Sequence, residues 1–239
     1  MTIKINGEIV RAFPYTLNES AQVKPARINY VDRATGIEVE IRAGMSDKPT
    51  DWFDPELFQE KGDLWGWYVV CNDRVVLRAN RDDLTVWDRG REFPNWHPQY
   101  NGFLGFVFFK SDKPELLPWT TTKREVDASS GVYRRAIVKM REVTRPWTRY
   151  TNDRKSNLTI AKQAESSVKP VPLMEITASK TLKLPKIRSS DAEDESVNIS
   201  YSVSMDNYKA VAKSLGNQKM PYKKVGQKTF NYYLENEVD

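Results

Sequence analysis

The 239-residue sequence predicts an α+β fold: a mixed or antiparallel sheet packed by one or two helices, then a linker and a small strand-helix-helix tail. Three observations predict it. Runs of alternating apolar and polar residues, typical of half-buried strands, occur in the first 59 residues, and more continuously apolar strand segments follow at 64–71 and 103–109. After residue 130, apolar residues instead repeat every three to four positions, as in an amphipathic helix. A charged, serine-rich stretch then precedes a short final block.

The strand signals are clearest in the first half of the chain. Asn6-Gly7 stands between short apolar runs and is the preferred pair for a type I′ hairpin turn. Apolar and polar residues alternate strictly over 37–42, which predicts an antiparallel sheet with one solvated face. Residues 64–71 are too apolar for an edge strand, so we expect them near the centre of the sheet. Strand 103–109 has large side chains on both faces, as a strand covered by a helix requires.

The helix expected to begin near Ser130 has one apolar and one basic face. The apolar face carries Tyr133, Ile137, Met140, Thr144 and Trp147. The basic row consists of Arg134, Arg135, Lys139, Arg141 and Arg145. Such a row can meet DNA phosphates, although a solvated charged face is the commoner outcome. Pro146 is expected to bend or end this helix, because proline cannot donate the backbone hydrogen bond.

Composition excludes several classes of function. The one cysteine, Cys71, excludes internal disulfides and fits a reducing compartment. The one histidine, His97, cannot build a multi-histidine metal site, and we expect no metal bound by this chain. A net charge of +5 is compatible with a nucleic-acid partner but does not require one. Without a secretory signal or a long apolar run, the protein is expected to be cytoplasmic, with no membrane partner.

Three regions are expected along the chain. Residues 1–154 are expected to form the α+β domain, and residues 155–196, rich in Ser, Lys, Glu and Pro, a flexible linker. Residues 197–239 read as a strand and two helices, the first ending at Gly216. This order resembles a ribbon-helix-helix module, which implies dimerisation through the strand and contact with DNA. The strand carries no Arg or Lys, so a plain dimerisation or docking tail is the alternative.

One lysine stands where a strand leads through a loop into the helix. Lys123 follows the hydroxyl residues 120–122 and precedes Asp127, Ser129 and Ser130, which are suitable helix caps. A lysine fixed between a buried strand and a packed helix can deliver one point charge to a phosphate. A solvated loop lysine is the commoner meaning of such a local sequence.

Several ordered blocks resemble the transducer half of GHKL-type ATPases, the superfamily of gyrase B, MutL and the microrchidia (MORC) proteins, and in particular MORC-like prokaryotic members. The blocks read GWYVVCNDRVVL, FLGFVFF, LPWTTTKREVD and VYRRAIVKMREVTRPW. The resemblance implies a catalytic role for Lys123, which would contact the γ-phosphate of ATP bound in a neighbouring domain. It also implies that Thr122 lies beside this lysine and that Arg74 touches the partner domain. ATP and Mg²⁺ would be held by that other domain.

The nucleotide pocket of this superfamily is missing from the sequence. It needs a helix carrying Glu and Asn, a D-x-G-x-G turn and a glycine-rich lid. Asp88-Arg89-Gly90 begins like that turn but continues Arg91-Glu92. We therefore expect the chain to be part of an ATPase whose nucleotide domain lies on another chain or in the same longer polypeptide.

The resemblance suggests a homodimer that works in DNA transactions or phage defence. Two other functions remain open from the sequence. One is a DNA-binding regulator that acts through the tail, and the other is a non-catalytic structural adaptor.

Overall fold

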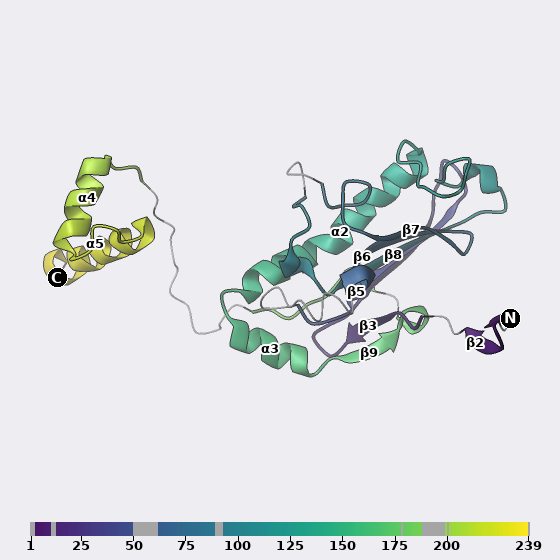
Figure 1. Ribbon diagram of the computed structural model, residues 1–239, viewed down its shortest axis with the longest axis horizontal. Helices are drawn as coiled ribbons and strands as arrows, with labels where there is room; N and C mark the ends of the chain where they lie inside the picture. The colour runs from purple at the N-terminus through teal and green to yellow at the C-terminus, as the bar shows by residue number, and fades with distance from the viewer. Residues whose placement is uncertain are drawn as a thin grey trace. The chain divides into compact units, whose positions relative to one another are not determined.

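The computed structural model describes residues 3–10, 13–49, 62–88, 93–177, 179–187, 199 and 201–238. The chain divides into two compact units, Met1–Ser189 and Ser190–Asp239. The first unit contains a five-stranded mixed sheet with a long helix across it (Figure 1), so the predicted α+β class is confirmed. In the part of the chain that the structure describes, no helix is both long enough and apolar enough to cross a bilayer.

The central sheet has the strand order β4-β5-β8-β6-β7. Its strands are β4 (Ala26–Val31), β5 (Glu38–Met45), β6 (Gly66–Cys71), β7 (Arg74–Asn80) and β8 (Phe103–Lys110). The pair β6–β8 is parallel and the other neighbouring pairs are antiparallel. Strand β6, which was expected near the centre, lies between β7 and β8, and β8 is the middle strand. Because β6 and β8 run parallel, both end at the same edge of the sheet, called here the carboxyl edge.

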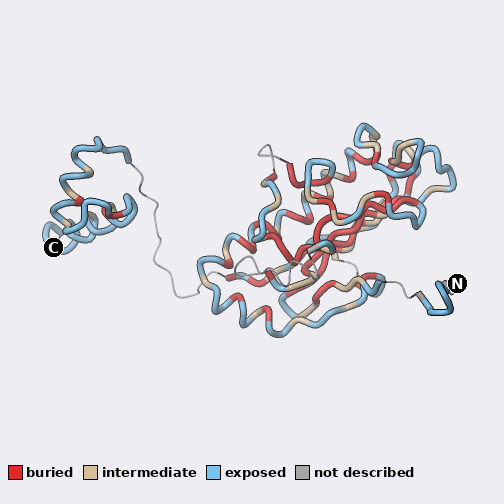
Figure 2. Tube along the Cα trace, in the orientation of Figure 1, coloured by how far each residue is buried: buried red, intermediate tan, exposed pale blue. Residues whose placement is uncertain are grey.

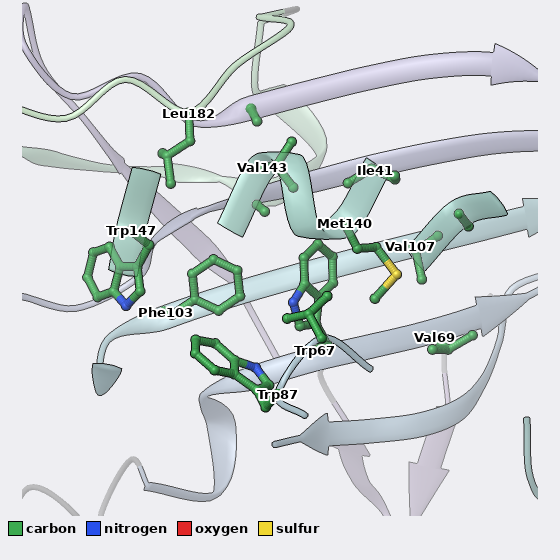
Figure 3. Close-up of a cluster of buried hydrophobic side chains, with 14 of the residues drawn as sticks. Ile41, Trp67, Val69, Trp87, Phe103, Val107, Met140, Val143, Trp147 and Leu182 are labelled. Carbon is green, nitrogen blue, oxygen red and sulfur yellow. The ribbon is translucent and has the colours of Figure 1, made fainter. Parts of the chain in front are cut away.

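Helix α2 (Gly131–Arg154) covers one face of this sheet. Side chains of α2 such as Met140 and Trp147 gather over Trp67 and Phe103 of the sheet (Figure 3), and this interface forms the main core. Figure 2 shows the buried residues concentrated along the sheet and the facing side of the helix. The helix begins at Gly131 as expected, but the side chain of its N-cap residue, Ser130, makes no capping hydrogen bond.

The prediction that Pro146 bends or ends this helix is wrong about its end, because α2 continues to Arg154. Val143, Trp147 and Tyr150 are all buried on the two sides of the proline. Tertiary packing supplies most of the stability of a helix in a protein, and here it holds both halves of α2 against the sheet. The lost hydrogen bond is therefore tolerated.

The opposite face of the sheet is also covered, which corrects the expectation of a solvated face. Strands β3 (Thr16–Glu19) and β9 (Lys169–Pro172) form an antiparallel pair, and the short 3₁₀ turn η4 (Leu173–Glu175) follows. Leu17, Leu173 and Ile176 pack there on Tyr68, Val70, Leu104 and Phe106.

Arg42 is the residue that shows this cover most clearly. It belongs to the polar face of its strand, yet only 3% of it is exposed. Its Nη1 donates to the carbonyl of Leu173 at 2.7 Å and its Nε donates to Glu40 Oε1 at 2.8 Å. The guanidinium thus satisfies a backbone carbonyl that would otherwise be buried without a donor.

Much of the stretch predicted as a flexible linker, residues 155–196, is folded into the first unit. It contains α3 (Leu158–Ser166), β9 and η4, and Lys183 bridges to Lys24 beside β4. Several apolar residues of this charged stretch are buried although others, such as Met174, are exposed, so the average composition did not predict its packing. The buried ones include Ala161, Leu173, Ile176, Leu182 and Ile187. Residues 188–196 lie outside the described residues.

The second unit is a pair of helices, α4 (Met205–Ser214) and α5 (Tyr222–Glu237), around a small core of Ala212, Met220 and Val225. The strand expected ahead of them is not formed at residues 199 and 201–204, the part of it that the structure describes. A strand needs a neighbour for its backbone hydrogen bonds. Ile199, Tyr201 and Val203 are accordingly exposed.

The predicted N-terminal hairpin is present as β1 (Ile3–Ile5) and β2 (Glu8–Val10). Asn6 and Gly7 have φ values of 51° and 86° between the strands, as a type I′ turn requires. The short 3₁₀ turns η1 (Gly62–Leu64), η2 (Pro98–Tyr100) and η3 (Pro114–Leu116) connect the later strands.

Candidate functional site

Lys123 lies on the connection between the central strand β8 and helix α2. After β8, the turn η3 leads to a short loop, Trp119–Val126, called here the lysine loop. A buried residue stands on each side of the loop tip: Leu117 lies just before the loop, and Val126 is the last residue of the loop. The predicted order of buried strand, loop lysine and packed helix is therefore present.

Backbone hydrogen bonds give the lysine loop a defined shape. Trp119 and Val126 form an antiparallel bridge at its base. The amide of Thr120 donates to the carbonyl of Glu125 at 2.9 Å, and the amide of Lys123 donates to the carbonyl of Thr120 at 2.8 Å. These bonds fold the loop as a miniature hairpin with Lys123 near its tip.

Lys123 has an unusual backbone conformation and an accessible charge. Its φ is 54°, in the left-handed region that costs a non-glycine residue about 1–2 kcal/mol. Such conformations persist only where the surroundings impose them, and they are common at ligand sites. The side chain is exposed and pairs with no carboxylate among the residues that the structure describes. Its Nζ instead lies 5.0 Å from the centre of the Trp119 ring.

Trp119 is the site residue that sequence reasoning missed. Its indole Nε1 donates to the carbonyl of Pro114 at 2.9 Å, which ties the ring to η3. Its ring face carries the Lys123 ammonium in a cation–π contact. The available signal was the spacing, since an aromatic residue four positions before a lysine can meet it across a tight loop.

The other two predicted site residues, Thr122 and Arg74, differ in their relation to Lys123: the first is in the same loop and the second is not. Thr122 is its neighbour in the loop, and its Oγ1 lies 3.0 Å from Thr120 Oγ1. Arg74 is exposed at the start of β7, after the turn that follows β6, so it belongs to the same carboxyl edge. Within the described part of the chain, no hydrogen bond or ion pair joins Arg74 to the lysine loop.

Two side-chain links hold the turns of the carboxyl edge in place. Asn72 Nδ2 donates to the carbonyl of Ser111 at 2.8 Å, and the Ser111 amide donates to Asn72 Oδ1 at 3.0 Å. On the other side of β8, Arg135 of α2 donates from Nε and Nη2 to the two carboxylate oxygens of Asp32 at 2.6 and 2.8 Å. Asp32 follows β4, so this ion pair fixes the first turns of α2 to the sheet. The hydrogen bonds from Arg135 lower the pKa of Asp32 to about 2.

We expect Asp32→Asn to lower the free energy of unfolding at pH 7 by about 1–2 kcal/mol. This is less than a fully buried charged hydrogen bond would contribute, because Arg135 is half exposed and solvent screens the pair. The pKa of Asp32 lies at about 2 in the fold against an ordinary 3.8. Its contribution is therefore complete above pH 3.8 and is lost as the pH falls through about 2. Urea unfolding at pH 2 to 7 measures the free energy of unfolding of both proteins. Between pH 3.8 and 2 the variant should lose less stability than wild type does.

Asp73→Asn is the matched control, because Asp73 forms an exposed pair with Lys110 at 3.7 Å. It should change stability by less than about 0.5 kcal/mol at any pH. If Asp32→Asn loses as much stability in acid as wild type does, the Asp32–Arg135 pair contributes nothing to stability.

Two residues of the predicted basic row of α2, Arg135 and Arg141, pair with carboxylates elsewhere in the fold, whereas Lys139 forms a surface pair and Arg134 and Arg145 are exposed. Arg135 pairs with Asp32, Arg141 Nη2 lies 2.7 Å from Asp88 Oδ2, and Lys139 pairs with Glu142. Asp88, which begins the incomplete D-x-G sequence, also accepts from the Phe93 amide at 3.0 Å. Asp88 therefore fastens a loop to α2, while DNA binding by this face stays a prediction.

Two further candidates have ordinary structural environments. Cys71 is buried in β6, and burial raises its pKa to about 12, which disfavours the thiolate needed for nucleophilic attack. His97 accepts from the Gln99 amide through Nδ1 and caps η2. Over the described ranges, no three His, Cys, Asp or Glu side chains are grouped as a metal site would need.

No protein-family model and no curated protein matches the sequence. The functional argument therefore depends on the lysine loop and on the fold that carries it.

Proposed function

We propose that this chain is the transducer portion of a MORC-like GHKL ATPase, in which Lys123 contacts the γ-phosphate of ATP held by a separate nucleotide domain. One observation carries the proposal: an exposed lysine stands near the tip of a hydrogen-bonded loop between the central strand and the main helix. Its left-handed backbone and the absence of a competing carboxylate among the described residues leave its charge available to an anion.

The chemistry required of Lys123 is modest. Phosphoryl transfer is catalysed mainly by positioning and by charges that stabilise the transferred group. A lysine ammonium supplies one such charge as a compact donor. Thr122 would shape the loop beside it, and Arg74, on the same edge, would meet the partner domain.

Metal binding and water activation belong to the other domain in this proposal. ATP and Mg²⁺ supply the phosphoryl group and neutralise its oxygens when they are bound there. The lysine loop offers an ammonium and hydroxyl groups, which suit a phosphate.

The fold provides a route from the phosphate to the rest of the domain. The lysine loop is joined through η3 to β8 at the sheet centre and is followed by α2, which the Asp32–Arg135 pair fixes to the sheet. A force on Lys123 would therefore move the sheet and α2 together, as coupling of nucleotide state to domain closure requires. A homodimer engaged in DNA transactions or phage defence is the setting that we propose.

The test is ATP hydrolysis by this chain together with its nucleotide domain, in one polypeptide or as a reconstituted pair. Lys123→Ala should lower turnover at least about tenfold, which corresponds to roughly 1.4 kcal/mol of transition-state stabilisation. Arg124→Ala is the matched control, because it removes an equally exposed positive charge from the next position of the same loop. It should leave turnover within about twofold of wild type.

Unchanged turnover in Lys123→Ala, with the two parts still bound to each other, would remove Lys123 from the chemistry. The structural-adaptor function would then be the better description. DNA binding that weakens steeply with salt and disappears on deletion of residues 197–239 would instead favour the regulator.

A further inference from the structure

The contact between Lys123 and Trp119 links two residues that are separately constrained. The indole is fixed by its hydrogen bond to the Pro114 carbonyl and by the bridge from Trp119 to Val126. The lysine backbone is fixed by its turn hydrogen bond to Thr120 and by its left-handed φ of 54°. The long lysine side chain between them is the mobile part, and the indole face is where its ammonium rests.

We propose that Trp119 is a positioning residue for Lys123: its indole face holds the lysine ammonium in one place, ready to meet a phosphate. This inference depends on the function proposed above, since the phosphate is the γ-phosphate of ATP. Trp119 itself touches no nucleotide in this scheme. It acts through the lysine that it carries.

The physical basis is the large conformational freedom of an exposed lysine. A free lysine side chain samples many rotamers, and binding an anion in one of them costs entropy. An exposed cation–π contact favours one arrangement by about two- to fivefold. An indole also leaves the ammonium available, whereas a carboxylate at that place would neutralise it and compete with the phosphate.

Trp119 also packs against the main core of the first unit, so its removal affects stability as well. A test must therefore separate positioning from packing. Trp119→Leu keeps apolar bulk but has no aromatic face, and Trp119→Phe keeps a weaker aromatic face without the N–H donor. Lys123→Met keeps the length of the lysine side chain and removes its charge.

The first experiment needs no nucleotide. The chain has seven tryptophans, so ¹⁹F NMR of protein labelled with 5-fluorotryptophan gives few resonances, and Trp119→Phe assigns the one from Trp119. Lys123→Met should shift the Trp119 resonance and leave the others in place, whereas Arg124→Met should leave all of them unchanged. If the chemical shift of the Trp119 resonance is the same in Lys123→Met as in wild type, the contact is absent and the inference fails with it.

The second experiment is a double-mutant cycle in ATP hydrolysis with the nucleotide domain present. Trp119→Leu should lower kcat by about two- to fivefold when Lys123 is present and change nothing in the Lys123→Met background. Trp119→Phe should fall between wild type and Trp119→Leu. Equal effects of Trp119→Leu in both backgrounds would show a packing role only and overturn positioning.

The two experiments distinguish failure of this inference from failure of the proposed function. If Lys123→Met hydrolyses ATP as fast as wild type, the phosphate role of Lys123 fails and positioning fails with it. If Lys123→Met is slow but the cycle is additive, the proposed function survives and only the role of Trp119 is lost.

Discussion

Glu165→Ala is expected to destabilise the first unit by about 3–5 kcal/mol, because it removes the carboxylate from a buried ionic cluster between α2 and α3. Glu165 is 1% exposed and Arg154 is 6% exposed. Glu165 Oε1 accepts from Arg154 Nε at 2.7 Å and from the Tyr150 hydroxyl at 2.5 Å, and Oε2 accepts from Arg154 Nη2 at 3.0 Å. Without Glu165, a guanidinium and a hydroxyl would both lose these acceptors in a dry environment.

Chemical denaturation monitored by circular dichroism measures this loss. Glu142→Ala is the matched control, because Glu142 pairs with Lys139 on the exposed side of α2, and it should cost less than about 0.5 kcal/mol. Glu165→Gln should fall between the two, since the amide keeps one acceptor and the shape. A cost for Glu165→Ala as small as that of the control would mean that the buried cluster does not hold α3 to α2.

Gly105→Ala is expected to cost about 3 kcal/mol, near the upper end of the usual penalty for overpacking a core. Gly105 lies in β8 directly beside Trp67 of the parallel strand β6. A Cβ atom at Gly105 would be 2.6 Å from the Trp67 ring, which is fully buried and packs 5.5 Å from the Phe103 ring. The indole cannot retreat without disturbing the core beneath α2, so one added methyl group has a large effect.

A double-mutant cycle with Trp67→Leu tests that cause. Once the indole is replaced by a smaller side chain, Gly105→Ala should cost less than about 1 kcal/mol, and the difference is the coupling between the two positions. Unfolding midpoints of the four proteins provide the measurement. Equal costs in both backgrounds would place the strain in the backbone of β8 rather than in the contact with Trp67.

The features that the sequence predicted correctly depend on local signals. Asn6-Gly7 specifies its own turn, the apolar run 103–109 specifies a buried strand, and the helix begins after Ser130 as expected. Each signal lies within a few residues of the structure that it produces. The place of Lys123 between a strand and a helix was also predicted from local sequence, whereas its contact with a phosphate stays a prediction.

The features that were missed depend on contacts between distant parts of the chain. Arg42 is buried because its guanidinium meets the carbonyl of Leu173, 131 residues further along. Strand β9 forms because β3 is its neighbour, and its own sequence, KPVP, is a poor strand signal. Pro146 is tolerated because the sheet packs against α2 on both sides of it. The contact between Trp119 and Lys123 likewise depends on the geometry of the loop and has no strong signal in the sequence.

The pairing of β3 with β9 has a mechanical consequence. Together with the bridge from Lys24 to Lys183, it joins the early and late segments of the first unit to each other, outside the hydrogen-bond ladder of the central sheet. A pull applied between residues 13 and 187 would load these peripheral pairs before it loads β8. These peripheral pairs would therefore separate first under tension, while the strand and helix on either side of Lys123 keep their geometry.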